Sequence, residues 1–425
     1  MQLTEDNIYR SSSQFRNWSF TPAKLAAQRQ TTNIQASERV KAAFARQRAQ
    51  RARQPDTASA SESERGNGSG IDTGSNTPIP VTNPADVNCL TVAEEMKLVD
   101  SFCERTLELG KFLKFPIEVT ATAIQFLRRF YLVNSPMTYE PQTISRSTMY
   151  LSTKVECHHR PAADYAAMLT KTTPESVIAP EYLIVQGLRF TFDVKHPFRG
   201  LKGGHLELME MARGNAAPTP HNTQTPAELQ KAMQALPKKA GEPPSHLSAA
   251  DLEKRITHAY TLASDTLKSV ALLTDAYFLY TPSQIWLAAH LLADEPLTAF
   301  YLSTKIPTSS PMYPKLLSRL NACAELLSSH RKFASQGTSE EEKKAREERD
   351  KKEVSALMKK LKQCRDPDKL DLVKLNQAQK RDALNADGQL EESKAKRRKM
   401  DRDALKKEEG DFWGPELPSR NGEKA

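Results

Sequence analysis

The stretch "IEVTATAIQFLRRFYL" at residues 117–132 decides the fold class. Its apolar side chains recur at i, i+4, i+7, i+8 and i+11, as Val119, Ala123, Phe126, Leu127 and Phe130. Because an α-helix turns once every 3.6 residues, this spacing gathers them on one helix face. The run that opens at Pro141, a favourable first-turn residue, repeats the pattern with Ile144, Thr148, Leu151 and Val155. The sequence therefore predicts successive helices that bury one face each.

The helical pattern continues on both sides of these two segments. It covers about 89–195 and returns at 250–280, 281–292 and 313–333. In "TPSQIWLAAHLL", Thr281 can cap the helix, Pro282 suits the first turn and Gln284 completes a capping box. "RFTFDV" at 189–194 alternates like a strand, but one short run cannot form a sheet, so we expect an extended exit from a helix. The predicted fold is all-α, with two compact clusters of about five helices each.

Composition divides the rest of the chain into segments with different expected behaviour. Two stretches are expected to be flexible and dispensable for partner binding. The first, at 51–88, is rich in Ser, Gly, Asn, Thr and Pro, and the second, at 213–247, contains six prolines. The expected order is a helical, aromatic leader at 1–50 that packs on the core through Tyr9 and Trp18, a disordered linker at 51–88, a first helical cluster at 89–195, a second at 196–335 with a Pro-rich insertion at 213–247, a charged helix at 338–365, and a disordered basic tail at 366–425.

The charged helix has acidic residues four positions before basic ones, as in Glu340/Lys344 and Glu347/Lys351. This order of charges supports a largely exposed helix. An apolar stripe at its end is expected to dock on the folded core, through Val354, Leu357, Met358 and Leu361.

Bulk properties narrow the class of protein. The 425 residues carry a net charge of +9 and are 38% apolar and 27% charged, and no apolar window approaches the ~18 residues of a membrane span. The start, "MQLTEDNIYR", lacks the features of a signal peptide. The five cysteines include no Cys-x-x-Cys pair, which favours reduced thiols in a nuclear or cytosolic protein. "KAKRRK" is a candidate nuclear-import cluster or a solvated basic tail, with Lys394, Lys396, Arg397, Arg398 and Lys399.

The stretch "TMYLSTKVECHH" at 148–159 raises the question of a metal site. Three adjacent ligands, Cys157, His158 and His159, do not converge easily on one tetrahedral ion, and protein sites normally use spaced pairs. We therefore expect a helix end with exposed imidazoles, and no metal or other cofactor. Catalytic motifs of the Gly-x-Ser-x-Gly, Walker and His-Glu-x-x-His kinds are missing from the sequence, and "GLKGG" at 200–204 is expected to be a turn before a helix. An enzyme is not expected.

Lys154 in the same stretch has two interpretations. It lies between Leu151 and Val155, close to the apolar face of its helix. Its stem can cover apolar surface while its ammonium group meets water, which is ordinary for lysine. Alternatively, the charge is held out toward a partner protein. Residue chemistry alone leaves both open.

A resemblance to a known family favours the second interpretation. "RRFYLVNSPMTYEPQTISRSTMYLSTKVE" at 128–156 and "PEYLIVQGLRFTFDVKHPFRGL" at 180–201 resemble the first box of cyclins, with the hallmark lysine at Lys154 and the hallmark glutamate at Glu181. "ALLTDAYFLYTPSQIWLAA" at 271–289 and "YRSSSQFRNWSF" at 9–20 are similar to the cyclin H family. The resemblance implies two cyclin-box repeats of five helices with extra terminal helices. Cys157 stands where the family often has a second acidic residue.

The resemblance also implies a function and a site. Lys154 and Glu181 would hydrogen-bond backbone groups of a kinase helix, with Glu156 and Tyr150 as further docking candidates and with apolar surface from the exposed edges of the third and fifth helices. The implied protein is a non-catalytic, nuclear cyclin that activates the cyclin-dependent kinase of TFIIH. That kinase phosphorylates the repeat tail of RNA polymerase II and, in some lineages, cell-cycle kinases. The other implied partners are a RING-type assembly factor and the TFIIH core. The resemblance implies no binding to a membrane or to a specific nucleic acid.

Three alternatives remain at the level of sequence. A cyclin C-type subunit of the Mediator kinase module is the nearest, but "LTDAYFLYTPSQI" favours the H type. A TFIIB-like initiation factor would bind promoter DNA through two cyclin-like repeats, and such factors usually carry a zinc ribbon, for which this sequence has no Cys-x-x-Cys pair. The third is a scaffold that binds no kinase.

Overall fold

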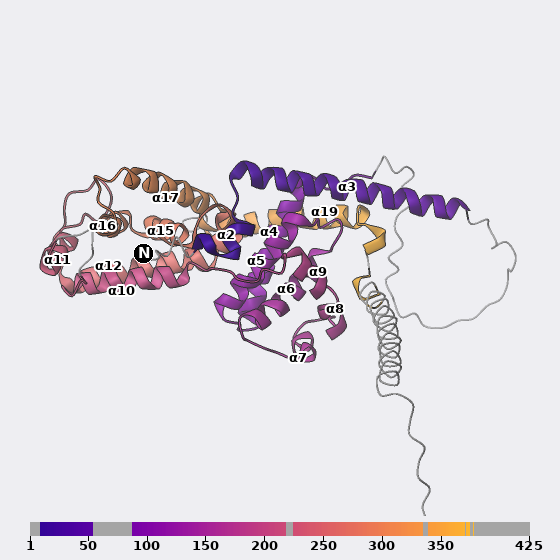
Figure 1. Ribbon diagram of the computed structural model, residues 1–425, viewed down its shortest axis with the longest axis horizontal. Helices are drawn as coiled ribbons and strands as arrows, with labels where there is room; N and C mark the ends of the chain where they lie inside the picture. Colours follow the sequence, from indigo (N-terminus) through magenta and orange to yellow (C-terminus); the bar gives the residue numbers. More distant parts are fainter. Residues whose placement is uncertain are drawn as a thin grey trace, which may run out of the picture. The chain divides into compact units, whose positions relative to one another are not determined.

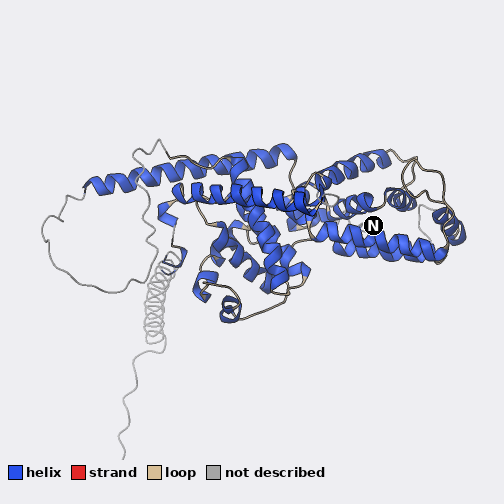
Figure 2. Cartoon of the chain, turned by 180° about the vertical axis from the view of Figure 1, so that it is seen from behind, coloured by secondary structure: helices blue, strands red, loops and turns tan. Residues whose placement is uncertain are grey.

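The computed structural model describes residues 9–53, 87–217, 224–334 and 339–369, together with 371–374 and 377. It divides into two compact units, Met1–Leu370 and Asp371–Ala425, and the helices described below lie in the first. The described residues form helices and connecting turns, with no strand among them (Figure 2). The all-α prediction is confirmed. The candidate nuclear-import cluster at 394–399 and linker residues 54–86 lie outside the described residues.

The first cluster is built around one helix that is buried on every side. Its helices are α4 (Val92–Phe112), α5 (Ile117–Val133), α6 (Pro141–Val155), α7 (Ala162–Ala167), α8 (Pro174–Ile178) and α9 (Glu181–Gly187). Every residue of α5 from Val119 to Leu132 is buried, including Arg128 and Arg129. The sequence predicted a single buried face for this segment. The polar positions between the apolar ones are also covered, because the leader and the second cluster pack against it.

The second cluster follows a short extended segment after α9. Its helices are α10 (Phe198–Ala212), α11 (Pro226–Gln234), α12 (Ala249–Lys268), α13 (Val270–Leu273), α14 (Ala276–Leu279), α15 (Pro282–Ala293), α16 (Glu295–Lys305), α17 (Met312–Ser328) and α18 (Arg331–Ala334). The predicted capping box of α15 is confirmed. The Gln284 amide donates to Thr281 Oγ1 over 3.3 Å, and the Thr281 amide donates to Gln284 Oε1 over 3.1 Å.

The "GLKGG" motif is not a turn, so that prediction was wrong. Residues 200–204 lie inside α10, and two of their glycines are one helical turn apart. A Cβ added to Gly200 or Gly204 would lie 2.6 or 2.8 Å from the ring of Trp286 on α15. These glycines therefore let α10 approach the Trp286 indole, which is only 7% exposed.

This contact gives a prediction with an internal control. Gly204→Ala should lower the free energy of unfolding by about 1–3 kcal/mol, because the new methyl overpacks the Trp286 ring. Gly203→Ala should raise it by about 0.5–1 kcal/mol, because nothing lies within 4 Å of the added Cβ and alanine favours a helix. Urea unfolding of both variants measures the difference. Shifts of the same sign would contradict the packing role of Gly204.

The Pro-rich insertion at 213–247 contains a packed helix, so the prediction of a flexible segment was wrong for this part. Thr225 and Glu228 form a capping box that starts α11 at Pro226. Leu229 and Met233 of α11 are 5% and 0% exposed. A proline at the first position of a helix costs no hydrogen bond, so Pro226 marks a helix start rather than a break. Deleting the whole insertion would uncover the surface that these two side chains bury.

The leader and the charged C-terminal helix pack together on the first cluster. The leader forms α2 (Ser13–Trp18) and α3 (Pro22–Arg53), and the predicted charged helix is α19 (Glu340–Gln363), followed by a short 3₁₀ turn at Pro367–Lys369. Figure 1 shows α3 and α19 running side by side. Their contact is apolar and includes the expected stripe, since one buried cluster combines Ala36, Val40, Val87, Leu90, Leu98, Met137, Val354, Leu357, Leu361 and Cys364.

Trp18 joins the leader to the segment that follows α9. It is 1% exposed, and its Nε1 donates to Thr191 Oγ1 over 2.9 Å. The guanidinium groups of Arg129 and Arg189 lie 5.3 and 5.2 Å from its ring centroid, within range of a cation–π interaction. Tyr9 is 6% exposed and accepts a long hydrogen bond from Gln14.

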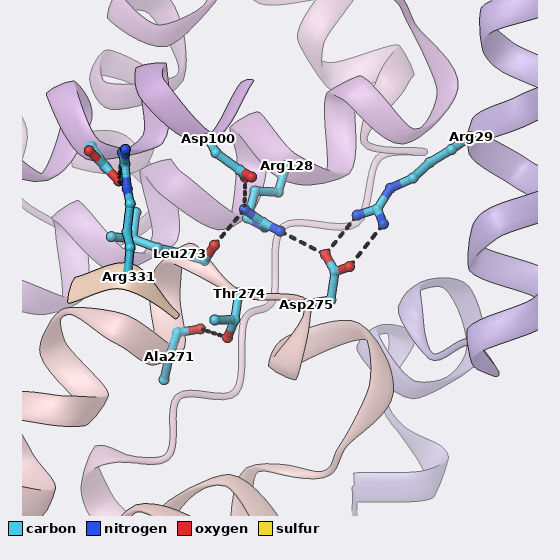
Figure 3. A network of polar contacts seen from close by, with 9 residues as sticks. Arg29, Asp100, Arg128, Ala271, Leu273, Thr274, Asp275 and Arg331 are labelled. Atoms are coloured by element: carbon cyan, nitrogen blue, oxygen red, sulfur yellow. Dashed lines mark hydrogen bonds and ion pairs between the residues drawn. The ribbon is translucent and has the colours of Figure 1, made fainter. Parts of the chain in front are cut away.

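A chain of charges joins the leader to both clusters (Figure 3). Asp275, in the turn between α13 and α14, accepts from Arg29 of α3 at 2.6 and 2.8 Å and from Arg128 of α5 at 2.7 Å. Arg128 also donates to Asp100 of α4 over 2.7 Å and to the Leu273 carbonyl over 3.2 Å. Since Arg128 has only 5% of its side chain exposed, Asp275 neutralises a charge that water cannot reach.

The same chain predicts how stability depends on pH. Burial alone would raise the pKa of Asp275, but the hydrogen bond from Arg29 and the charge of Arg128 outweigh it and hold that pKa at about 2. A carboxyl with a lowered folded pKa stabilises the fold above its unfolded value of about 3.9 and loses this contribution as the pH falls toward 2. The loss should amount to about 2 kcal/mol. Urea midpoints between pH 6 and 2.5 test this, and Asp275→Asn should lack that part of the pH dependence.

Candidate partner-docking site

The sequence-predicted pair Lys154 and Glu181 meets at the ends of two helices. Lys154 lies in the last turn of α6, and Glu181 lies in the first turn of α9, where a carboxylate suits the helix dipole. The Lys154 Nζ is 2.6 and 2.8 Å from the two carboxylate oxygens of Glu181. The fold thus brings together two side chains that are 27 positions apart.

The pair is accessible and can exchange its partners. Lys154 has 36% of its side chain exposed, and Glu181 has 23%. An ion pair of this exposure stabilises a protein by about 0.2–1 kcal/mol, so little is lost if either group turns to a new partner. An ammonium group has three N–H donors, and two of them point at Glu181. The pair can therefore offer a donor and an acceptor to another backbone at the same time.

The two secondary docking candidates lie deeper than the pair. Tyr150 is 6% exposed, packs against Tyr165 with ring centroids 5.3 Å apart, and presents its ring 4.6 Å from the Lys154 Nζ. The Tyr150 ring thus lies within range of a cation–π interaction with the Lys154 ammonium group. Glu156 is half-buried at the end of α6, where Thr122 Oγ1 donates to its Oε1 over 2.6 Å.

The "CHH" motif is the end of α6, as predicted. Cys157 has a φ of 57°, in the left-handed region, and its amide donates to the Lys154 carbonyl over 3.4 Å. The His158 amide donates to the Thr153 carbonyl over 2.7 Å. These two bonds are the pattern of a Schellman motif, which closes a helix by satisfying its last carbonyl groups. The side chains of Cys157, His158 and His159 are exposed.

Three exposed apolar side chains on α8, on α9 and just after α9 were not identified from the sequence. Ile178 of α8, Tyr182 of α9 and Phe190 after α9 are 38%, 57% and 63% exposed. Arg189 and Phe190 both have positive φ values, 54° and 55°, which is a strained arrangement for side chains of this size. Only Tyr182 carried a local signal, because it follows the hallmark glutamate directly. We define the docking edge as Lys154, Glu181, Glu156, Ile178, Tyr182 and Phe190.

Other kinds of site find little support in the part of the chain that the structure describes. No group of three or more His, Cys, Asp or Glu side chains there could hold a metal ion. A cleft of about 380 Å³ lies between α4, α18 and α19 and is lined mainly by charged side chains, with Arg331 joined to Glu104 and Asp350 across it. None of the described helices is long and apolar enough to cross a membrane.

Comparison with known proteins identifies relatives of this arrangement. The family model of the cyclin C-terminal domain matches residues 196–328. Cyclin CCL1 of Saccharomyces cerevisiae is 29% identical over 307 residues, which cover 72% of this chain and 63% of the relative. A putative cyclin-H of Dictyostelium discoideum is 33% identical over 127 residues, 30% of this chain and 44% of the relative. The chain therefore spans less than two thirds of the length of these curated relatives.

Among solved structures, a chain of the CAK complex from Chaetomium thermophilum, bound to ATP-γ-S, is similar to this protein. It is 30% identical and superposes with a TM-score of 0.64. The match covers 90% of this chain and 96% of that chain.

Proposed function

Because the chain belongs to the cyclin family, as an H-type member, we propose that it binds and activates the cyclin-dependent kinase of TFIIH. The observation that carries the proposal is the accessible Lys154–Glu181 pair, together with exposed apolar side chains on α8, on α9 and just after α9. The relative in the CAK complex, bound to ATP-γ-S, supports a kinase assembly as the setting. The chain itself supplies no catalytic group and acts through its partner.

Activation follows from preferential binding to one conformation of the kinase. Phosphoryl transfer needs a glutamate on a mobile kinase helix to pair with a lysine in the kinase active site. Lys154 and Glu181 hydrogen-bond the backbone of that helix in its active position, so binding shifts the population toward the active state. A shift from 1:99 to 99:1 requires about 5.5 kcal/mol of differential affinity.

The docking edge can supply free energy of this size. Hydrogen bonds to charged groups contribute about 1.5–3 kcal/mol each, which leaves at most about 2.5 kcal/mol for apolar contacts. At roughly 25 cal/mol per Å², burying on the order of 100 Å² of apolar surface is sufficient. Ile178, Tyr182 and Phe190 expose side chains large enough for this. At the lower end of this range, charge and apolar area are both needed, whereas at the upper end the two hydrogen bonds alone reach the required free energy.

The same family membership supports a wider proposal. The activated kinase phosphorylates the repeat tail of RNA polymerase II and supports transcription initiation in the nucleus. The kinase, a RING-type assembly factor and the TFIIH core are the partners. The chain uses no cofactor and does not recognise a specific nucleic-acid sequence.

One experiment tests the proposal directly. The full chain is used as bait in nuclear extract, and the recovered kinase is assayed on a peptide of the polymerase repeat with and without added chain. A kinase recovered in equal amount and stimulated by the chain is the expected result. Retention of promoter DNA without a kinase, or a recovered kinase that the chain does not stimulate, would contradict the proposal.

A further inference from the structure

A chain of hydrogen bonds runs from the second cluster to the docking edge. The Tyr277 hydroxyl of α14 lies 3.0 Å from Nδ1 of His196, in the segment between the two clusters. The Nε2 of His196 is 2.9 Å from Thr122 Oγ1 on α5, and that oxygen is 2.6 Å from Glu156 Oε1 at the end of α6. Four elements far apart in sequence therefore contribute to one continuous chain.

The chemistry of the groups fixes the direction of this chain. A carboxylate can only accept, so the Thr122 hydroxyl donates to Glu156. The Thr122 oxygen then accepts from the Nε2–H of His196, and the unprotonated Nδ1 of that ring accepts from the Tyr277 hydroxyl. A neutral imidazole has one donor and one acceptor, which this arrangement requires. Burial, with a smaller contribution from Arg129, lowers the pKa of His196 to about 3, so the ring is neutral near pH 7.

Burial makes each link of the chain necessary for the next. Thr122 is 0% exposed and Tyr277 is 3% exposed. The His196 ring stacks on Phe198 with centroids 5.3 Å apart and an interplanar angle of 14°, which holds its plane. A buried donor or acceptor that loses its partner is costly, and this applies to the hydroxyl groups of Thr122 and Tyr277. The side chains therefore have one well-satisfied arrangement.

The far end of the chain is anchored independently. Tyr277 lies two residues after Asp275, which Arg29 and Arg128 clamp from the leader and from α5 (Figure 3). The turn that presents Tyr277 is thus fixed relative to the first cluster. Glu156, at the other end, is the C-cap of α6, and its amide still donates to the Ser152 carbonyl over 2.9 Å, so its backbone is held and only its side chain remains to be oriented. Its carboxylate depends on Thr122 for a defined position.

We propose that Thr122, His196 and Tyr277 are positioning residues that orient the Glu156 carboxylate, so that the second cluster tunes partner binding without touching the partner. Thr122 holds Oε1 and leaves Oε2 able to accept a hydrogen bond from the kinase. The proposal rests on the proposed function, because it takes the kinase as the partner of the docking edge.

The test is a double-mutant cycle measured as kinase affinity. Tyr277→Phe removes only the first donor of the chain and should weaken kinase binding about three- to tenfold. In a Glu156→Ala background, the same change should have almost no further effect, because the carboxylate that it positions is gone. Tyr131→Phe is the matched control. Tyr131 is also buried, at 8% exposure, and its hydroxyl donates to the Tyr139 carbonyl over 2.8 Å, outside the chain. It should leave affinity unchanged.

Two outcomes would overturn the proposal. One is an equal loss for Tyr277→Phe with and without Glu156, and the other is a loss of the same size for Tyr131→Phe. The ¹⁵N resonances of His196 give a readout that needs no kinase. We expect a protonated Nε2 and an unprotonated Nδ1, with Nδ1 shifting in Tyr277→Phe and Nε2 shifting in Glu156→Ala. The opposite tautomer would refute the chain of hydrogen bonds. A native tautomer in a protein that binds no kinase would refute only the proposed function.

Discussion

A Lys154→Glu chain should bind its kinase at least a hundredfold more weakly and fail to activate it. The change removes a charge-assisted hydrogen bond and sets a carboxylate against kinase carbonyl groups, at a cost of about 3–5 kcal/mol. Folding should hardly change, because the Lys154–Glu181 pair is a third exposed on its lysine side and contributes at most about 1 kcal/mol. Calorimetric titration with purified kinase, a repeat-peptide kinase assay and thermal melting of the free chain measure the three quantities.

Exchanging the two charges separates docking from internal pairing. The double variant Lys154→Glu/Glu181→Lys restores an ion pair between α6 and α9 but presents each charge in the wrong place. It should melt like the wild type and remain unable to activate the kinase. Recovery of activation in this variant would mean that the pair only holds the two helices together.

A second control addresses the metal interpretation. Replacing Cys157, His158 and His159 together by Ala should leave activation unchanged, and added zinc should not raise the melting temperature. If this variant is inactive while Lys154→Glu is active, the docking interpretation fails and a metal site at the end of α6 must be reconsidered.

Asp275→Ala should destabilise the fold more than either Gly204→Ala or Lys154→Glu, lowering the free energy of unfolding by about 3–5 kcal/mol. The change removes one of the two carboxylates that pair with Arg128, whose side chain is only 5% exposed. It also removes both hydrogen bonds that Arg29 of the leader donates to Asp275. Urea unfolding measures the loss. Asp164→Ala, at an exposed position of α7, is the control and should have little effect. A loss below about 1 kcal/mol for Asp275→Ala would show that the charge chain is not structural.

Local signals in the sequence were sufficient for the helices but not for their burial. The Thr281 capping box lies within four residues and could be identified directly. By contrast, the burial of Arg128 on α5 depends on Asp275, 147 positions away, which no periodicity reveals. The glycines of "GLKGG" were misinterpreted for the same reason, since their partner Trp286 belongs to another helix.

The docking edge was predictable in part and for a different reason. Lys154 and Glu181 were identified through a resemblance, and residue chemistry alone left ordinary snorkelling of Lys154 open. The motif "LTDAYFLYTPSQI" served only as a family marker in the sequence. In the structure, its residues connect the second cluster to the leader and to the first cluster. Asp275 clamps two arginines, Tyr277 contacts His196, and Phe278 packs against Trp18 and Leu25 of the leader. The partners in these contacts lie far away in the sequence. The motif could therefore be recognised from the sequence, but its structural role could not be predicted.

The bond between Arg29 and Asp275 also determines when the chain can fold during its synthesis. The two residues are 246 positions apart, so the leader emerges from the ribosome long before its partner exists. At about 5–20 residues per second, the interval is roughly 12–50 s. During that time Trp18 and Leu25, which end up buried against Phe278, have no second cluster to cover them. A nascent chain therefore leaves Trp18 and Leu25 without their contact to Phe278 until translation has passed residue 278.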